Sequence, residues 1–205
     1  MLSKRISVLL ASGSASGTIA AVRNLGANGI HVGVMSSNLL SAAAWSRWAA
    51  RSHWSPPETK SHEFLERLLA IGAADPGQIL LPTSDETAWL YSANAELLSE
   101  HFRLYQPALA TIKRILDKTQ LAAAAEKVGI DVLPTWDPQS ADELETLAPT
   151  LPYPVLIKPR THVHRRRNDK GIAARSPAEL ILGYQKFVDR ERVPAARAKS
   201  QRGRG

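Results

Sequence analysis

The sequence contains no cysteine, so disulfides and thiolate metal sites are excluded, and nothing in its 205 residues indicates an oxidising compartment. Long apolar runs are also absent. The longest, such as 6–11 and 79–82, fall far short of the roughly 20 residues that span a bilayer. The N-terminus carries Lys4 and Arg5, but the apolar stretch behind them soon breaks into Ser and Gly, unlike a signal peptide. We therefore expect a cytoplasmic protein with no membrane partner.

Acidic residues are scarce in the C-terminal quarter. From Lys158 to the end there are 14 Lys and Arg against 4 Asp and Glu, a balance of +10 within a total of +7. Residues 1–157 hold the other 12 basic and 15 acidic residues, a balance of −3. A uniformly basic nucleic-acid-binding domain would not have this distribution. The pattern argues against nucleic acid as a partner of the folded part.

The first 110 residues alternate strand and helix patterns. Short apolar runs at 6–10, 30–35, 79–81 and 102–105 predict strands, with helical patterns between most of them. The segment that holds Trp45, Trp48 and Trp54 has neither a clear strand pattern nor a clear helix pattern. Alternation of this kind indicates a doubly wound parallel sheet, so we expect an α/β protein with a Rossmann-like domain in residues 1–110.

From residue 111 the pattern changes, and we expect a second, α+β unit over 111–189. Asp117 with Gln120 predicts the start of a helix that Gly129 ends. Residues 130–136 are predicted as a strand, and Ser140 with Glu143 as the cap of a short helix.

Two further segments complete the predicted second unit. Residues 153–158 have the pattern of a buried strand with a hairpin partner at 171–174, and Ser176 and Glu179 form a capping box for a helix to about Val188. Residues 190–205 are basic and poor in apolar residues, so we expect them to be disordered.

Two turns are candidate ligand-binding sites. The turn with Gly13, Ser14 and Gly17 follows a strand and opens a helix, where backbone N–H groups bind anions, although two glycines also suit a simple tight turn. Its G-x-x-x-G spacing does not match the dinucleotide motif. Asp85 and Glu86 follow the strand at 79–81, where ligands collect in open α/β sheets. In a capping box that begins at Thr83, however, the acids could serve the helix alone.

Lys158 is the third candidate. A lysine at the end of an apolar strand needs solvent or an anionic partner, because burial of an unpaired ammonium is costly. It either protects an edge strand from aggregation or binds a phosphate as a point charge.

The strand-turn "LPTSDETA", the helix start "LDKTQLAAAAEKVGIDVLPTW" and the strand "PYPVLIKP" together resemble the ATP-grasp superfamily, carboxylate–amine ligases of the D-aspartate ligase-like and carbamoyl-phosphate-synthase-like branches. In that family a Rossmann-like domain precedes a two-part ATP-grasp fold. The resemblance covers roughly residues 5–188. It implies that Lys118 and Lys158, 40 positions apart, bind the phosphates of ATP, with Lys170 and Gly171 in the loop that follows.

The resemblance also has limits. The family's phosphate loop is rich in Gly and Ser, whereas 160–171 holds a single glycine. Mg²⁺ is implied as a cofactor, yet the family's magnesium-binding Glu and Glu-x-Asn pair have no match here. We therefore expect a truncated ATP-grasp protein that binds nucleotide, has little or no activity alone, and self-associates through an uncovered sheet face. The alternative is a non-enzymatic binding module whose basic C-terminal region engages nucleic acid or another polyanion.

Overall fold

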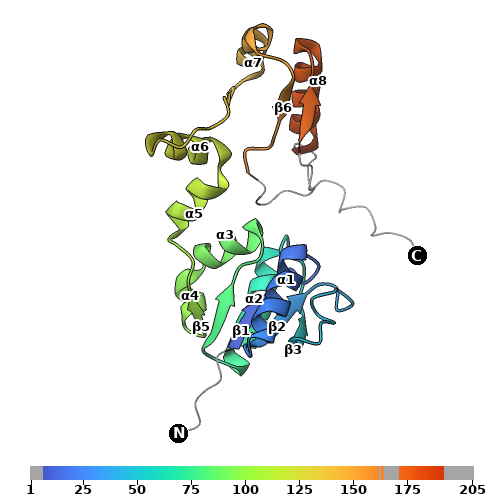
Figure 1. Ribbon diagram of the computed structural model, residues 1–205, viewed down its shortest axis with the longest axis vertical. Coiled ribbons are helices and arrows are strands. Elements are labelled where there is room, and N and C mark those ends of the chain that lie inside the picture. The colour runs from blue at the N-terminus through green and yellow to red at the C-terminus, as the bar shows by residue number, and fades with distance from the viewer. Residues whose placement is uncertain (1–6, 162, 164–170, 192–205) are drawn as a thin grey trace, which may run out of the picture. The chain divides into compact units, whose positions relative to one another are not determined.

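A computed structural model describes residues 7–161, 163 and 171–191 (Figure 1). The chain divides into two compact units. Among the described residues, unit 1 comprises 7–121 and 163, and unit 2 comprises 122–161 and 171–191. In the described ranges, no helix combines the length and the apolar composition needed to cross a bilayer.

The described part of unit 1 is built on a parallel sheet with the strand order β3-β2-β1-β4-β5. Its strands are β1 (Ser7–Leu10), β2 (His31–Ser36), β3 (Ala49–Trp54), β4 (Gln78–Leu81) and β5 (Phe102–Leu104). The connecting helices are α1 (Ser16–Ala27), α2 (Ser61–Ala74), α3 (Asp85–Ala93), α4 (Ala95–Ser99) and α5 (Leu109–Leu116). Helix α6 (Lys118–Lys127) follows. The predicted doubly wound parallel sheet is confirmed.

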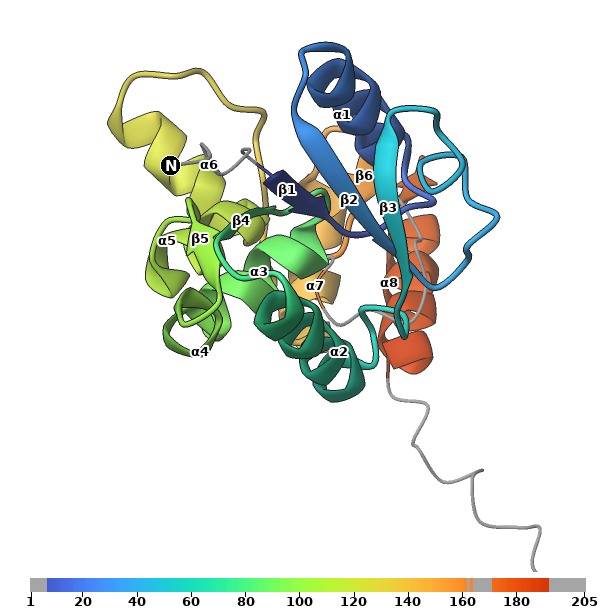
Figure 2. The ribbon, with the colours of Figure 1, turned by 90° about the horizontal axis from the view of Figure 1, so that it is seen from below.

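Alternating side chains along β1, β2 and β4 enter two separate cores. Val8 packs with Val22 of α1 on one face, whereas Leu9 packs with Phe64 of α2 and Tyr91 of α3 on the other. Figure 2 shows α1 and α2 on opposite sides of the strands. All five of these side chains are at most 3% exposed, so the sheet is covered on both faces, as parallel sheets usually are.

Strand β3 lies in the tryptophan-rich segment, where the sequence pattern favours neither a strand nor a helix. Most of its residues are exposed, because it forms the edge of the sheet. The register with β2 shifts at Val32/Gly33: Val32 pairs with Ala49, and Gly33 pairs with Arg51. Ala50 is therefore the extra residue of a β-bulge, which reverses the faces of the residues after it.

The helix after β4 begins differently from the prediction. Ser84, not Thr83, caps α3: its Oγ accepts a hydrogen bond from the Thr87 N–H at 3.2 Å, and Thr87 Oγ1 accepts from the Ser84 N–H at 3.1 Å. The predicted box of Thr83 and Glu86 is wrong. Thr83 Oγ1 instead donates to the carbonyl of Ala11 at 2.7 Å, which ties the end of β4 to the end of β1.

Unit 2 is a hairpin covered by helices. It contains α7 (Ala141–Leu147), the 3₁₀ turn η1 (Ala148–Thr150), β6 (Val155–Ile157), β7 (Ile172–Ala174) and α8 (Pro177–Glu191). β6 and β7 pair antiparallel, as predicted. Leu144, Ala148, Ala174 and Leu180 form the buried core. The predicted caps of α7 and α8 are present: the N–H groups of Glu143 and Glu179 donate to Ser140 Oγ and Ser176 Oγ.

Three predictions for unit 2 are wrong in detail. Residues 130–136 form no strand; Leu133 is 85% exposed and Pro134 lacks the N–H that a ladder needs. β6 is limited to Val155–Ile157, so Lys158 lies just beyond the strand and is exposed. Helix α8 continues to Glu191, so residues 190 and 191, which were expected to be disordered, are helical. Residues 192–205 lie outside the described residues.

Candidate functional site at the carboxyl edge of the parallel sheet

Polar groups from three loops meet where β1 and β4 end. Ser12, directly after β1, donates its hydroxyl to Glu58 Oε1 at 2.6 Å, and its Oγ lies 3.3 Å from Ser84 Oγ. The backbone of Ser12 has φ = +55°, a left-handed conformation that is uncommon for residues other than Gly, Asn and Asp. Residues held in such conformations cluster at binding and catalytic sites, so Ser12 marks this edge as a candidate site.

The two glycines of the β1–α1 turn have different roles. A Cβ on Gly13 would lie 2.7 Å from Ser36 Cβ and 2.8 Å from Ser41 Oγ, so only glycine fits between these side chains. A Cβ on Gly17 would meet no atom within 4 Å. The Ser41 hydroxyl beside Gly13 is buried and has no hydrogen-bond partner in the described structure. Gly13 therefore brings the loop against a polar group that still lacks a partner.

Helix α1 starts at this loop without a side-chain cap. Ala15 occupies the N-cap position, and the first turn holds no acidic residue. Ser14 and Gly17 are exposed beside this helix end. Since the helix dipole places partial positive charge there, an anion at Ser14 would meet uncompensated donors.

The acids of the second predicted loop lie in the first turn of α3. Asp85 is exposed and Glu86 is half-buried. Because Ser84 and Thr87 provide the cap, the acids are not needed for capping. Their charges still suit the helix N-terminus.

The phenol group of Tyr91, on α3, is buried in the core on the α2 face of the sheet. Its side chain is fully buried, and its hydroxyl has no hydrogen-bond partner among the described residues. Burial, with a smaller contribution from the negative charge of Glu58, raises the pKa of Tyr91 well above its ordinary value, so the phenol stays a neutral donor. A buried donor without a partner is uncommon in native proteins, and a bound group would satisfy it.

Sequence reasoning missed most of these residues. It selected Gly13, Ser14, Gly17, Asp85 and Glu86, and the structure brings Gly13 together with Ser12, Ser41, Glu58 and Ser84 instead. Ser12 could have been selected as the first polar residue after a strand. Glu58 and Ser41 lie in segments with no motif.

Lys118 is the first residue of α6 and is half-buried. The predicted cap at Asp117 is confirmed: Asp117 Oδ1 accepts from the N–H groups of Thr119 and Gln120, each at 3.0 Å. Gln120 Nε2 also donates to Asp117 Oδ2 at 3.2 Å. The capping fixes Lys118 at the helix start.

Lys158 and Gly171 lie next to each other in unit 2. Gly171 has φ = +151°, and a Cβ there would lie 2.9 Å from the carbonyl oxygen of Ile157 and 3.4 Å from Lys158 Cγ. Glycine is therefore required at 171 by both conformation and space. Lys170 lies outside the described residues. In the described part of the chain, no group of three or more His, Asp or Glu could hold a metal ion.

No family model and no curated protein sequence matches this chain. Several solved structures do match the chain. One is the biotin carboxylase domain of 2-oxoglutarate carboxylase from Hydrogenobacter thermophilus, with a TM-score of 0.64 and 19% identity, over 92% of this chain and 42% of that one. Another is L-amino acid ligase from Bacillus licheniformis, with a TM-score of 0.63 and 13% identity, over 91% of this chain and 43% of that one.

The ADP complex of N5-carboxyaminoimidazole ribonucleotide synthetase, PurK, has a TM-score of 0.63 at 15% identity, over 93% of this chain and 46% of that one. This chain thus spans less than half the length of each of the three. All three are ATP-grasp enzymes, and the matched part is their N-terminal portion. The chain has the fold of the N-terminal portion of ATP-grasp enzymes.

Proposed function

We propose that this protein binds ATP, and that it represents the N-terminal portion of an ATP-dependent carboxylate–amine ligase. The observation that carries the proposal is the fold of the ATP-grasp enzymes over about nine-tenths of the chain, with lysines at both motif positions. One of these similar structures contains MgADP and bicarbonate, and another contains ADP. The D-aspartate ligase-like or carbamoyl-phosphate-synthase-like branch remains the specific proposal from the sequence motifs.

In the proposed reaction a carboxylate oxygen of the substrate attacks the γ-phosphorus of ATP, and the bond from that phosphorus to the bridging oxygen of ADP breaks. The nitrogen of an amine then attacks the acyl carbon and loses a proton, and inorganic phosphate leaves. Mg²⁺, when bound, spreads the charge of the transferring phosphoryl group. The magnesium-binding residues of the family have no match in this sequence, so the proposal for the 205-residue chain itself is nucleotide binding.

Lys118 and Lys158 would each bring a positive charge to the nucleotide phosphates. Two features support this role: the Asp117 cap fixes Lys118 at the start of α6, and Lys158 is exposed directly after β6. Gly171 lies against Lys158, which supports its place in the same proposed phosphate-binding loop. Lys170 is proposed from the sequence motif alone.

The carboxylate substrate is proposed to bind at the carboxyl edge of the unit 1 sheet. The loop of Gly13, Ser14 and Gly17 offers backbone N–H groups at the start of α1, where a carboxylate would be stabilised.

On the other side of this edge, Asp85 and Glu86 would attract the amine of a second substrate. Their position in the first turn of α3, at the carboxyl edge of the sheet, supports this role.

Nucleotide binding is tested by isothermal titration of MgATP and MgADP into the wild type and single-lysine variants. Lys118→Ala and Lys158→Ala should each weaken binding about tenfold or more, because each removes a charge-assisted contact. Lys127→Ala and Lys186→Ala are matched controls, since both lysines are exposed on α6 and α8. Equal affinity of wild type and Lys158→Ala, or no binding by the wild type at millimolar nucleotide, would overturn the proposal.

The domain limits and the assembly remain proposals. We propose a Rossmann-like domain at 1–110, a partial ATP-grasp subdomain at 111–189 and a basic segment at 190–205. Self-association is supported by Leu156, which is 55% exposed on the face of β6 opposite the unit 2 core. Sedimentation of the wild type and Leu156→Lys tests it: a dimer that the lysine dissociates supports the proposal, and a monomeric wild type contradicts it.

A second candidate function is polyanion binding by the basic segment after Lys158, which the local balance of +10 favours. Such binding falls steeply with salt and should be lost when residues 190–205 are deleted. Nucleotide binding that survives the deletion would favour the first function over this one.

A further inference from the structure

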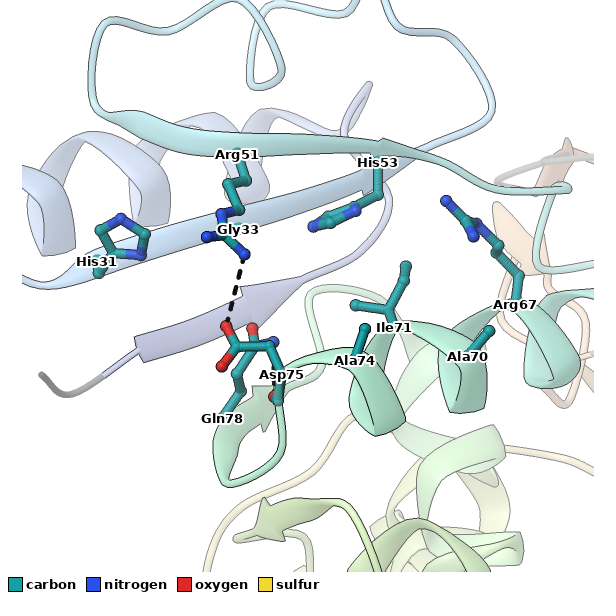
Figure 3. A pocket seen from close by; sticks show the side chains of 10 residues that line it. All are labelled: His31, Gly33, Arg51, His53, Arg67, Ala70, Ile71, Ala74, Asp75 and Gln78. Carbon is teal, nitrogen blue, oxygen red and sulfur yellow. Dashed lines mark hydrogen bonds and ion pairs between the residues drawn. The ribbon is translucent and has the colours of Figure 1, made fainter. Parts of the chain in front are cut away.

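A pocket of about 170 Å³ lies in unit 1 between the α2 face of strands β2 and β3 and helix α2 (Figure 3). It involves none of the residues proposed to bind nucleotide or substrate. Small residues make the space: Gly33 on β2 has no side chain, and Ala70 and Ala74 face it from α2. A Cβ on Gly33 would come within 3.0 Å of Leu9 Cδ1.

Arginine and histidine side chains line this pocket from both sides. Arg51 and His53 reach in from β3, His31 from β2 and Arg67 from α2, as Figure 3 shows. Asp75 is the one carboxylate among the described lining residues. The β-bulge at Ala50 produces this arrangement, because an unbroken register would pair Gly33 with Ala50 and turn Arg51 and His53 to the α1 face.

The positive charge of the pocket is only partly neutralised. Arg51 Nη1 lies 3.8 Å from Asp75 Oδ2, and both side chains are substantially exposed, at 62% and 41%. A solvent-exposed ion pair of this length contributes little. Arg67 Nε donates to the carbonyl of Trp54 at 3.0 Å, which orients the guanidinium, and no described carboxylate lies within ion-pair distance of it.

The positive charge of the pocket affects the pKa of His53. Its pKa is lowered first by burial and then by the nearby charges of Arg67 and Arg51, while Asp75 opposes the shift. Gln78 directs its amide nitrogen to the Asp75 carbonyl at 3.1 Å. The pocket thus presents two guanidinium groups with N–H donors to spare and a neutral imidazole.

We propose that this pocket binds a tetrahedral oxyanion, either inorganic phosphate or the phosphate group of a monoester. Arg51 and Arg67 supply the charge and the planar sets of donors that match phosphate oxygens, and His53 supplies a further donor. The pocket has room for one such anion together with a few waters. The pocket shares no lining residue with the carboxyl-edge site.

The test is isothermal titration of inorganic phosphate into the full chain at constant ionic strength, with chloride as the balancing anion. Arg67→Gln and Arg51→Gln should each weaken binding about tenfold, since each removes one charge-assisted contact. Arg23→Gln is the matched control, because Arg23 is an exposed arginine on α1, on the other face of the sheet, and its loss removes the same charge. That variant should stay within about twofold of wild type, since screening removes distant charges.

Two further variants distinguish binding in this pocket from binding elsewhere on the protein. Ala74→Leu fills the pocket without a change of charge and should abolish binding, whereas Ala20→Leu, the same change at an exposed position of α1, should leave it unchanged. Absence of phosphate binding at millimolar concentration, wild-type affinity in Arg67→Gln, or equal losses in Arg67→Gln and Arg23→Gln would each overturn the proposal. Methyl phosphate distinguishes the sources: binding equal to that of inorganic phosphate identifies a monoester-compatible site, and selective binding of inorganic phosphate identifies an ion site.

Discussion

The sheets of units 1 and 2 are buried to different extents. In unit 1 both faces of the parallel sheet are covered, and Leu9 of β1 is 0% exposed. In unit 2 Val155 and Ile157 of β6 pack on the core, whereas Leu156 between them is 55% exposed. A two-stranded hairpin is marginal alone and depends on helices packed against it. Unit 1 therefore has a two-sided core, and unit 2 rests on a single layer that α7 and α8 provide.

The difference extends to the candidate sites. The carboxyl edge of unit 1 joins residues that are far apart in the chain, such as Ser12 and Glu58, 46 positions apart. In unit 2, Lys158 and Gly171 meet because a hairpin brings neighbouring segments together. A site of the first kind depends on the integrity of the whole sheet, and one of the second kind on a local turn.

The largest effect should come from the removal of matched core leucines. Leu68 on α2 is 0% exposed and Leu180 on α8 is 6% exposed. We expect Leu68→Ala to cost about 4 kcal/mol and Leu180→Ala about 2 kcal/mol, because the thin layer of unit 2 can collapse into the space. Urea unfolding with hydrogen exchange read by mass spectrometry reports each unit. Equal costs would contradict the contrast between the two cores.

Two helical glycines provide the next comparison. A Cβ on Gly72 would lie 2.5 Å from a ring carbon of Phe102 and 2.8 Å from His101 Cβ, whereas one on Gly183 would meet Ile157 Cδ1 at 2.5 Å. The end of an isoleucine can rotate, but the buried ring cannot. We expect Gly72→Ala to lose about 1–3 kcal/mol and Gly183→Ala less than about 1 kcal/mol. Thermal unfolding measures both, and a larger loss in Gly183→Ala would mean that β6 is packed as rigidly as β5.

Two tyrosines should respond with opposite signs. The Tyr91 hydroxyl is buried without a described partner, whereas the Tyr153 hydroxyl donates to the Ala148 carbonyl at 2.8 Å. We expect Tyr91→Phe to stabilise the protein by about 1 kcal/mol, and Tyr153→Phe to destabilise it by a similar amount. Equilibrium unfolding in urea gives both values. Destabilisation by Tyr91→Phe would show that its hydroxyl has a partner in solution.

The smallest effect concerns pH and should be confined to unit 1. The pKa of His53 is lowered in the folded state, so the unfolded chain binds more protons as the pH falls below the ordinary value of 6.5. His53 therefore contributes stability above that value, and the contribution is lost on acidification. We expect His53→Gln to flatten the dependence of the melting temperature on pH between about 5 and 7. His62→Gln, which changes a histidine that is 86% exposed, is the control and should follow the wild type.

Much of the fold could be predicted because its signals are local. Hydrophobic periodicity indicates four strands of unit 1 and the β6–β7 hairpin. Pairs of polar residues three positions apart indicate the caps at Asp117, Ser140 and Ser176. The failures have physical causes as well. Strand β3 is polar because it is an edge, and Thr83 does not cap α3 because its hydroxyl bonds to the Ala11 carbonyl, 72 positions away.

The sequence by itself determined most of the strands and helices of unit 1, the β6–β7 hairpin, and the attachment of Lys118 and Lys158 to a helix start and a strand end. Hydrogen bonds within one turn and hydrophobic periodicity fix such features. Only the tertiary structure decided which side chains share a site: Ser12 contacts Glu58 at the carboxyl edge, and Arg51 and Arg67 line the same pocket. The reason is strand register, since one extra residue at Ala50 selects the face on which Arg51 and His53 lie, and that choice depends on the pairing of β3 with β2.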